Sequence, residues 1–219
     1  MAVEARHTPN HVGRDQGEFS KMTKASPRKS AEEARTQEII EAAVTCVSRL
    51  GARKVSVEDI ATEAGISRRT LYRLYPNRRA IMRAAIFNRL EKIALQIQDA
   101  MRKCKTFEDC IVTGSVLTIK IAMRDEVYVS IENDDNTLVL DDPDYPEGTR
   151  VEPLFLSTWA GVFDRGRKEG KIHKSLTNHQ LADWLMSVHL MIQWREDLSD
   201  TEKANLLRTF VLPSLKYAE

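Results

Sequence analysis

Two arginines four positions apart, Arg69 and Arg73, have side chains suited to contact nucleic acid. A guanidinium group forms paired hydrogen bonds with guanine O6 and N7, and it also pairs with phosphate oxygens. At about 100° per residue on a helix, both arginines point to one side, whereas Leu71, Leu74 and Tyr75 share the opposite side. The spacing therefore predicts a short helix with an apolar inner face and a basic outer face that fits a DNA major groove.

The residues before this helix predict a second short helix that supports it. Ser56 is suited to cap the first helix, and Gly65 supplies the left-handed residue at its end. Ser67 is suited to cap the second helix, Arg68–Tyr75. The first helix has one narrow apolar face, formed by Val57, Ile60, Ala61 and Ala64. Two short helices joined by a tight glycine turn predict a helix-turn-helix.

The segment from Gly51 to Arg79 resembles the N-terminal DNA-binding domain of the TetR-type (TetR/AcrR) transcriptional regulators. Small departures from the family pattern are Leu74, Tyr75 and the pair Asn77-Arg78, which keep size, capping ability and charge. The matching residues are Gly51, Ser56, Ile60, Ala61, Ala64, Gly65, Ile66, Ser67, Leu71, Tyr72, Tyr75, Pro76, Asn77 and Arg78.

The resemblance implies an all-α fold of about nine helices. An N-terminal three-helix DNA-binding domain with a helix-turn-helix would precede a C-terminal helical ligand-binding and dimerisation domain. We assign residues 1–30 to a flexible basic arm, 31–79 to the DNA-binding domain and 80–219 to the ligand-binding and dimerisation domain. The implied function is a repressor that a small hydrophobic or amphipathic molecule releases from a palindromic operator. The alternatives are a ligand-dependent activator and a helical dimerisation or scaffold protein.

Composition agrees with a cytoplasmic DNA-binding protein. The 219 residues carry a net charge of +1, but residues 1–79 hold 15 Lys and Arg against 10 Asp and Glu, a net charge of +5. The chain contains neither an apolar membrane span nor the apolar core of a secretory signal. Cys46, Cys104 and Cys110 are odd in number and lack CxxC spacing, which predicts buried reduced thiols. A redox pair of Cys104 and Cys110 is the alternative.

The candidate DNA contacts divide into base-reading and phosphate-binding residues. Arg69 and Arg73 are the candidates for base edges. Arg78 and Arg79 follow Asn77 at the start of a predicted long helix, 77–103, where free backbone N–H groups favour phosphate. The alternative for Arg78 and Arg79 is that both are solvated without a phosphate partner. For residues 1–30 the alternatives are an arm that contacts DNA and a solvated tail. The full set is Ser56, Ser67, Arg68, Arg69, Thr70, Tyr72, Arg73, Arg78 and Arg79.

Further helices are predicted near 107–124, 149–169, 178–196 and 201–217. In the family the middle helices hold an effector cavity, and apolar walls suit a hydrophobic small molecule. The candidate lining residues, for which ordinary core packing is the alternative, are Met101, Phe107, Met123, Tyr128, Phe155, Trp159, Phe163 and Trp184.

The helix over 178–196 is apolar around most of its circumference, which requires burial on two sides. Pairing of the last two helices with a second copy of the chain provides that burial as a four-helix interface, and this is also where the family dimerises. Burial within one subunit is the alternative. The candidate interface residues are Ala182, Met186, His189, Gln193, Leu206 and Phe210.

The sequence offers no recognisable catalytic or metal-binding motif. It has no Gly-rich phosphate loop, nucleophile elbow or HExxH pattern, so we expect neither an enzyme nor a cofactor. The acidic stretch 132–147 lacks the spacing of a calcium loop, and a solvated loop is expected there. Its relation to the entrance of the cavity stays open.

Overall fold

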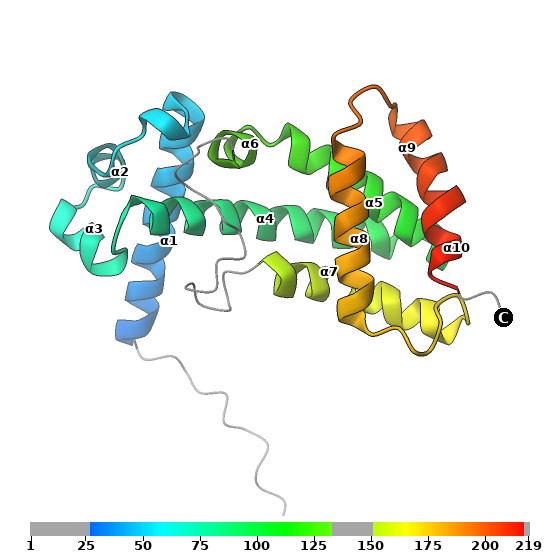
Figure 1. Cartoon of the computed structure of the whole chain (residues 1–219). Coiled ribbons are helices and arrows are strands. Elements are labelled where there is room, and N and C mark those ends of the chain that lie inside the picture. Colours follow the sequence, from blue (N-terminus) through cyan, green and yellow to red (C-terminus); the bar gives the residue numbers. More distant parts are fainter. Residues whose placement is uncertain (1–26, 133–150, 217–219) are drawn as a thin grey trace, which may run out of the picture.

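The computed structural model describes residues 27–132 and 151–216, and every secondary-structure element in these ranges is helical (Figure 1). The all-α prediction is therefore confirmed. The N-terminal elements are α1 Pro27–Leu50, the 3₁₀ turn η1 Ala52–Lys54, α2 Val57–Glu63 and α3 Arg68–Leu74. Then follow α4 Arg78–Arg102, α5 Phe107–Arg124, α6 Glu126–Glu132, α7 Val151–Lys168 and α8 Asn178–Gln193. The last helix consists of α9 Asp200–Leu206, the π-helical turn η3 Leu207–Val211 and α10 Leu212–Ser214.

The predicted caps of the helix-turn-helix are all present. Ser56 accepts from the Asp59 backbone N–H at 3.1 Å, and Asp59 in turn accepts from the Ser56 N–H, which completes a capping box. Ser67 accepts from the Thr70 N–H and Asn77 from the Ala80 N–H, so these two side chains cap α3 and α4. Gly65 has a φ of 64°, a conformation that is costly for residues with a Cβ. Local sequence therefore determines where α2, α3 and α4 begin.

Helix α1 begins earlier than the sequence predicted. We expected residues 1–30 to form an arm, but Pro27 already lies in the first turn of α1. Proline is favoured there because the first N–H groups of a helix have no intrahelical partner. The arm residues Arg6, Arg14, Lys21 and Lys24 lie outside the described residues.

Two hydrophobic clusters divide the molecule, and the long helix α4 takes part in both (Figure 1). The N-terminal cluster unites α1, η1, α2 and α3 with Ile81, Met82, Ala85 and Ile86 of α4. The second cluster contains the far end of α4, from Ile93 onwards, together with α5, α7, α8 and the last helix. The packing thus crosses the expected boundary at Arg79, because the first turns of α4 pack against α1 in the same cluster as the helix-turn-helix.

The short helix α6 also belongs to the N-terminal cluster although it follows α5 in sequence. Val127, Tyr128 and Ile131 are buried there. The backbone N–H of Ala52 donates a hydrogen bond to Ser130 Oγ at 2.9 Å. Helix α6 therefore contacts the DNA-binding side of the molecule directly, in addition to the connection through α4.

Two glycines of α7 predict opposite effects of the same substitution. A Cβ at Gly166 would lie 2.5 Å from Phe107 Cε2 and 2.7 Å from Ile172 Cδ1, so we expect Gly166→Ala to cost about 1–3 kcal/mol of stability. A Cβ at Gly161 meets no atom within 4 Å, and Gly161→Ala should stabilise the helix by about 0.5–1 kcal/mol. Urea denaturation of both variants checks this, and a destabilised Gly161→Ala would contradict it.

Candidate DNA-binding surface and effector cavity

Helix α3 is held by its apolar side and presents its basic side outward. Leu71 is fully buried and Tyr75 is 9% exposed, whereas Arg69 and Arg73 are exposed. Burial raises the pKa of Tyr75 to about 12, so its hydroxyl group stays neutral at the pH of the cell. Neither Arg69 nor Arg73 forms an ion pair with any described residue. Two guanidinium groups are therefore available to an external partner.

Arg68 differs from these two arginines because it is engaged within the protein. It forms an ion pair with Glu58 of α2, and its guanidinium carbon lies 5.9 Å from the centre of the Tyr72 ring. A hydrogen bond with Tyr72 and the charge of Glu58 raise the pKa of Arg68. The side chains of α2 thus orient one end of α3, and Tyr72 remains 43% exposed beside it.

Arg78 has a structural task that the sequence did not predict. Its Nε donates to the Val55 carbonyl at 2.9 Å, and its Nη2 donates to the Ala52 carbonyl. These bonds tie the start of α4 to the η1–α2 connection, and the phosphate role of Arg78 stays a prediction. Arg79 is half-buried at the same helix end, and its phosphate role stays a prediction.

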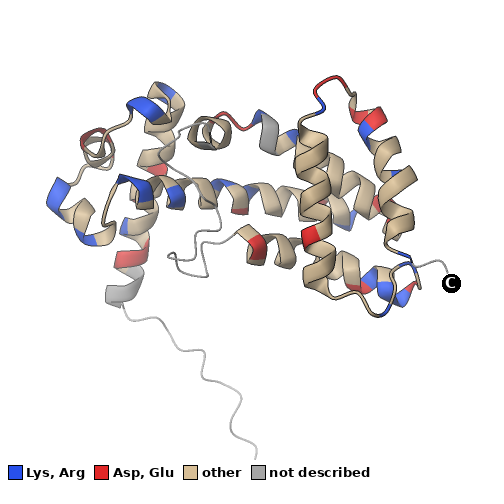
Figure 2. Cartoon of the chain, viewed as in Figure 1, with Lys and Arg blue, Asp and Glu red and all other residues tan. Residues whose placement is uncertain are grey.

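The remaining candidate DNA contacts lie at the helix starts. Ser56 and Ser67 cap α2 and α3, so their hydroxyl groups already have backbone partners. The Ser67 and Thr70 hydroxyl oxygens lie 2.9 Å apart at the exposed start of α3. Figure 2 shows basic residues along α3 and at the start of α4, with acidic residues on the adjacent α2. Among the described residues, the exposed basic side chains of this domain thus include those of α3 and the pair Arg53 and Lys54 of η1.

A cavity of about 220 Å³ lies in the C-terminal half, between α4, α5, α6, α7 and α8. Its walls are almost entirely apolar, and none of the described residues that line it carries a charged side chain. Of the predicted pocket residues, Tyr128, Phe155 and Trp159 line the cavity. The full lining is Leu90, Ile93, Ala94, Ile97, Thr118, Tyr128, Val151, Leu154, Phe155, Thr158, Trp159, Met186, His189, Leu190 and Gln193.

The other predicted pocket residues do not line this cavity. Met101, Phe107 and Phe163 are buried in the second hydrophobic cluster, where they fill space between helices. Trp184 is 42% exposed and donates from Nε1 to Ser214 Oγ at 3.0 Å, so it covers the last helix from outside. Met123 lies outside the residues whose side chains are described.

Helix α8 is turned differently from the expected orientation. Met186, His189 and Gln193, which we assigned to a dimer interface, line the cavity instead, and Ala182 is fully buried in the core. Leu206 is half-buried, and only Phe210 of the predicted interface set is largely exposed, at 66%. The solvent-facing side of α8 carries Trp184, Leu190, Met191 and the flanking Trp194. Both sides of this helix carry apolar residues, so periodicity alone did not show which side faces the cavity.

His189 is the most unusual polar group of the cavity. Its side chain is buried, and neither Nδ1 nor Nε2 has a hydrogen-bond partner among the described residues. The imidazole packs against the rings of Phe155 and Trp159, with ring centres 5.7 and 5.8 Å away. Burial lowers the pKa of His189 to about 3, so the ring is neutral at pH 7. His189 therefore supplies no positive charge that could pair with an anionic ligand.

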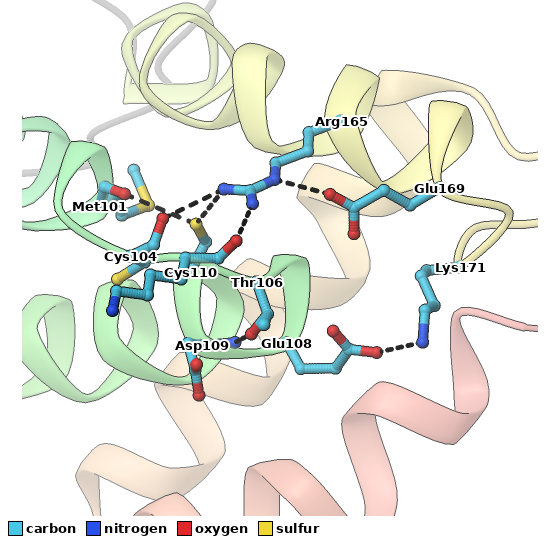
Figure 3. A network of polar contacts seen from close by, with 10 residues as sticks. Met101, Cys104, Thr106, Glu108, Asp109, Cys110, Arg165, Glu169 and Lys171 are labelled. Carbon is cyan, nitrogen blue, oxygen red and sulfur yellow. Dashed lines mark hydrogen bonds and ion pairs between the residues drawn. The ribbon is translucent and has the colours of Figure 1, made fainter.

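The three cysteines are free thiols; Cys46 and Cys110 are buried, as expected, whereas Cys104 is half-buried. Burial raises the pKa of Cys46 and of Cys110, and the neighbouring Cys104 raises that of Cys110 further. Arg165 of α7 reaches across to this pair and donates to Cys110 Sγ at 3.5 Å and to the Cys104 carbonyl at 3.2 Å (Figure 3). This contact fastens α7 to the loop between α4 and α5.

The described parts of the chain contain no group of three or more His, Cys, Asp or Glu side chains arranged to hold a metal ion. Within these ranges no helix has the length and apolar character needed to cross a membrane.

Comparison with known proteins agrees with this architecture. Residues 39–85, which span the helix-turn-helix, match the family described as "Bacterial regulatory proteins, tetR family". No curated protein is significantly similar to the chain in sequence.

Several solved structures share the fold over most of the chain. The transcriptional regulator FadR from Bacillus subtilis in complex with stearoyl-CoA is 17% identical, with a TM-score of 0.56 over 79% of this chain and 97% of FadR. The repressor AlkX from Dietzia sp. strain DQ12-45-1b is 18% identical, with a TM-score of 0.60 over 87% of this chain and 96% of AlkX. RolR in complex with resorcinol is 13% identical, with a TM-score of 0.61 over 86% of this chain and 91% of RolR. At these identities the likeness establishes the fold. With the helix-turn-helix matched and its basic helix exposed, residues 39–85 form a DNA-binding segment of the tetR family of bacterial regulatory proteins.

Proposed function

We propose that this regulator represses transcription by binding a palindromic operator as a homodimer, and that a small apolar molecule in the cavity releases it. The observation that carries the proposal is the exposure of Arg69 and Arg73 on a helix whose other side is buried. Such a helix enters the major groove, where arginine reads guanine, while Thr70 and Tyr72 are placed beside it. Binding to chromosomal DNA implies that the protein works in the cytoplasm.

Dimerisation is supported by the solvent-facing side of the last two helices. Trp194 is 76% exposed, Phe210 66% and Met191 62%, and these side chains, with the exposed Trp184, favour a surface that a partner covers. Pairing of this surface about a two-fold axis would bury it. A symmetric dimer then offers two α3 helices, about 34 Å or a multiple of that apart, on one side of the DNA.

The cavity supports regulation by a small molecule. FadR is known with stearoyl-CoA and RolR with resorcinol, so regulators of this fold hold ligands of very different sizes. A cavity of about 220 Å³ favours a compact ligand for this chain. Repression is the default in the family. A ligand-dependent activator would use the same surface and the same cavity.

Tyr128 provides a physical connection between the cavity and the DNA-binding domain. It lines the cavity and also packs in the N-terminal hydrophobic cluster. Two residues further along α6, Ser130 accepts from the Ala52 N–H, and the Ala52 carbonyl accepts from Arg78 at the start of α4. A ligand shifts the DNA-binding equilibrium only if it binds one arrangement of these contacts better than the other.

We expect Arg73→Ala and Arg69→Ala each to weaken binding to the selected DNA by about 1–3 kcal/mol and to relax specificity at one base position. Selection of bound sequences from a random pool, followed by titration of the winner and of unrelated DNA, measures both effects. Arg102→Ala removes an equally exposed arginine at the far end of α4 and should change neither affinity.

Two inverted half-sites in the selected sequences would support the dimer and the operator symmetry. If Arg73→Ala lowers the affinity for specific and for unrelated DNA equally, Arg73 does not read a base. It would then be a phosphate contact. Failure to select any sequence would favour the scaffold alternative.

A further inference from the structure

The neutral imidazole of His189 is a buried polar group that the protein itself leaves unsatisfied. Both ring nitrogens lack a partner among the described residues, although the side chain is almost completely removed from solvent. An unpaired buried polar group of this kind typically costs about 1–3 kcal/mol. Because such groups are rare in folded proteins, a partner from outside the chain is the natural explanation.

The other hydroxyl groups of the lining already have partners. Thr118 Oγ1 donates to the Gly114 carbonyl at 2.8 Å, and Thr158 Oγ1 donates to the Leu154 carbonyl at 2.7 Å. Gln193 is half-buried and lies one turn beyond His189 on α8. The imidazole of His189 thus belongs to the cavity lining and carries two buried ring nitrogens without a partner among the described residues.

The shape and walls of the cavity favour an aromatic ring. Phe155 and Trp159 are stacked with ring centres 5.6 Å apart and an angle of 24° between the rings, and both face His189. A dry cavity of about 150 Å³ holds benzene, so one of about 220 Å³ has room for a single substituted ring. A long acyl chain with a bulky polar head exceeds this volume.

We propose that the cavity binds uncharged hydroxylated single-ring aromatics, the phenol class, with the ligand hydroxyl hydrogen-bonded to His189. A hydroxyl group both donates and accepts, so it pairs with the imidazole in either tautomer. The described lining residues offer a carboxylate no cation to replace its lost hydration, which disfavours an anionic ligand. This assignment rests on the proposed function only for its regulatory meaning, since ligand binding is measurable without DNA.

The test compares phenol, toluene and benzoate by calorimetric titration of the full-length protein in the absence of DNA. Phenol should bind roughly tenfold more tightly than toluene, which has the same shape without the hydroxyl group. Benzoate should bind at least tenfold more weakly than phenol. His189→Phe keeps a flat ring but removes both nitrogens, and it should lower phenol affinity to that of toluene while leaving toluene affinity unchanged.

His179→Phe is the matched control, because His179 lies on the same helix but is exposed and outside the cavity. It should leave phenol binding unchanged. Equal affinities of wild type for phenol and toluene, preference for benzoate, or unaltered phenol binding in His189→Phe would each overturn the assignment. The comparison of ligands in wild type keeps the test valid even if His189→Phe folds poorly.

A separate titration of DNA distinguishes this inference from the proposed function. Loss of DNA affinity on adding phenol, absent in His189→Phe, supports both. Phenol binding through His189 with unchanged DNA affinity upholds the ligand assignment and contradicts release by ligand. If phenol does not bind in calorimetry and does not change DNA affinity at any concentration, the ligand class is overturned. The DNA-binding proposal then still stands.

Discussion

Replacing Arg89 by Met is expected to lower the free energy of unfolding by about 3 kcal/mol. Arg89 of α4 donates from Nε to Asp125 Oδ2 at 3.0 Å, and a second bond from Nη2 reaches the same oxygen. The Asp125 side chain is only 5% exposed, so removal of the cation leaves a carboxylate buried without its counter-charge. The expected loss is at the lower end for buried pairs because a third of the Arg89 side chain is in contact with solvent.

The double variant Arg89→Met/Asp125→Asn should recover more than half of this loss. In the wild type, Asp125 Oδ1 accepts a hydrogen bond from the Tyr128 backbone N–H at 2.9 Å, at the start of α6. An asparagine at position 125 keeps an oxygen acceptor for this N–H and removes the buried negative charge. Arg102→Met is the control, since Arg102 pairs with Asp99 on the surface and should cost less than about 1 kcal/mol. Equal losses for Arg89→Met and Arg102→Met in chemical denaturation would show that the buried pair has no special weight.

His189 should make the protein lose stability in mildly acidic solution. Burial lowers its pKa from 6.5 to about 3 in the folded state, so below pH 6.5 the unfolded chain binds a proton that the folded chain does not. The contribution of neutral His189 to the free energy of unfolding is fully present above pH 6.5 and decreases as the pH drops toward 3. At 1.36 kcal/mol per pKa unit, the loss reaches about 2 kcal/mol at pH 5 and about 3 kcal/mol at pH 4.

Comparison with His189→Phe isolates this contribution from the carboxylates that also titrate in acid. The stability of wild type minus that of the variant should decrease by about 2 kcal/mol between pH 7 and pH 5, measured by urea denaturation. His179→Phe, which alters an exposed histidine, should show no comparable change with pH. A constant difference between wild type and His189→Phe would mean that His189 is solvated or paired in the folded protein.

Local chemistry explains why the DNA-binding end was predictable from sequence. Ser56, Ser67 and Asn77 cap the helices that their positions predicted, because a cap depends on residues only three positions away. The outward side of α3 also followed from spacing alone, since Leu71 is fully buried and Arg69 and Arg73 are exposed. The family resemblance, confirmed over residues 39–85, rests on the same local pattern.

Long-range packing explains why the roles of Trp184, His189 and Arg78 could not be predicted from the sequence. Trp184 was expected in the cavity but is exposed, whereas His189 was expected at an interface but lines the cavity. Helix α8 has apolar residues on both sides, so a periodicity of 3.6 residues defines its faces without telling which one meets α7. Arg78 likewise bonds to carbonyls 23 and 26 residues earlier in the chain, a contact that depends on the fold of η1. Its position after Asn77 suggested a phosphate site only because that position lies at a helix start.

The contribution of α6 to the N-terminal hydrophobic cluster has a consequence for engineering hybrid regulators. Grafting residues 1–79 onto a foreign sensor would remove Ile81, Met82 and Ile86 of α4, and also Val127 and Ile131 of α6, from the apolar base on which the operator-reading unit rests. A transplant that carries only the contiguous N-terminal stretch leaves that base open to water. The residues that form the N-terminal hydrophobic cluster are therefore discontinuous in sequence, and α6 of the C-terminal half contributes part of that cluster.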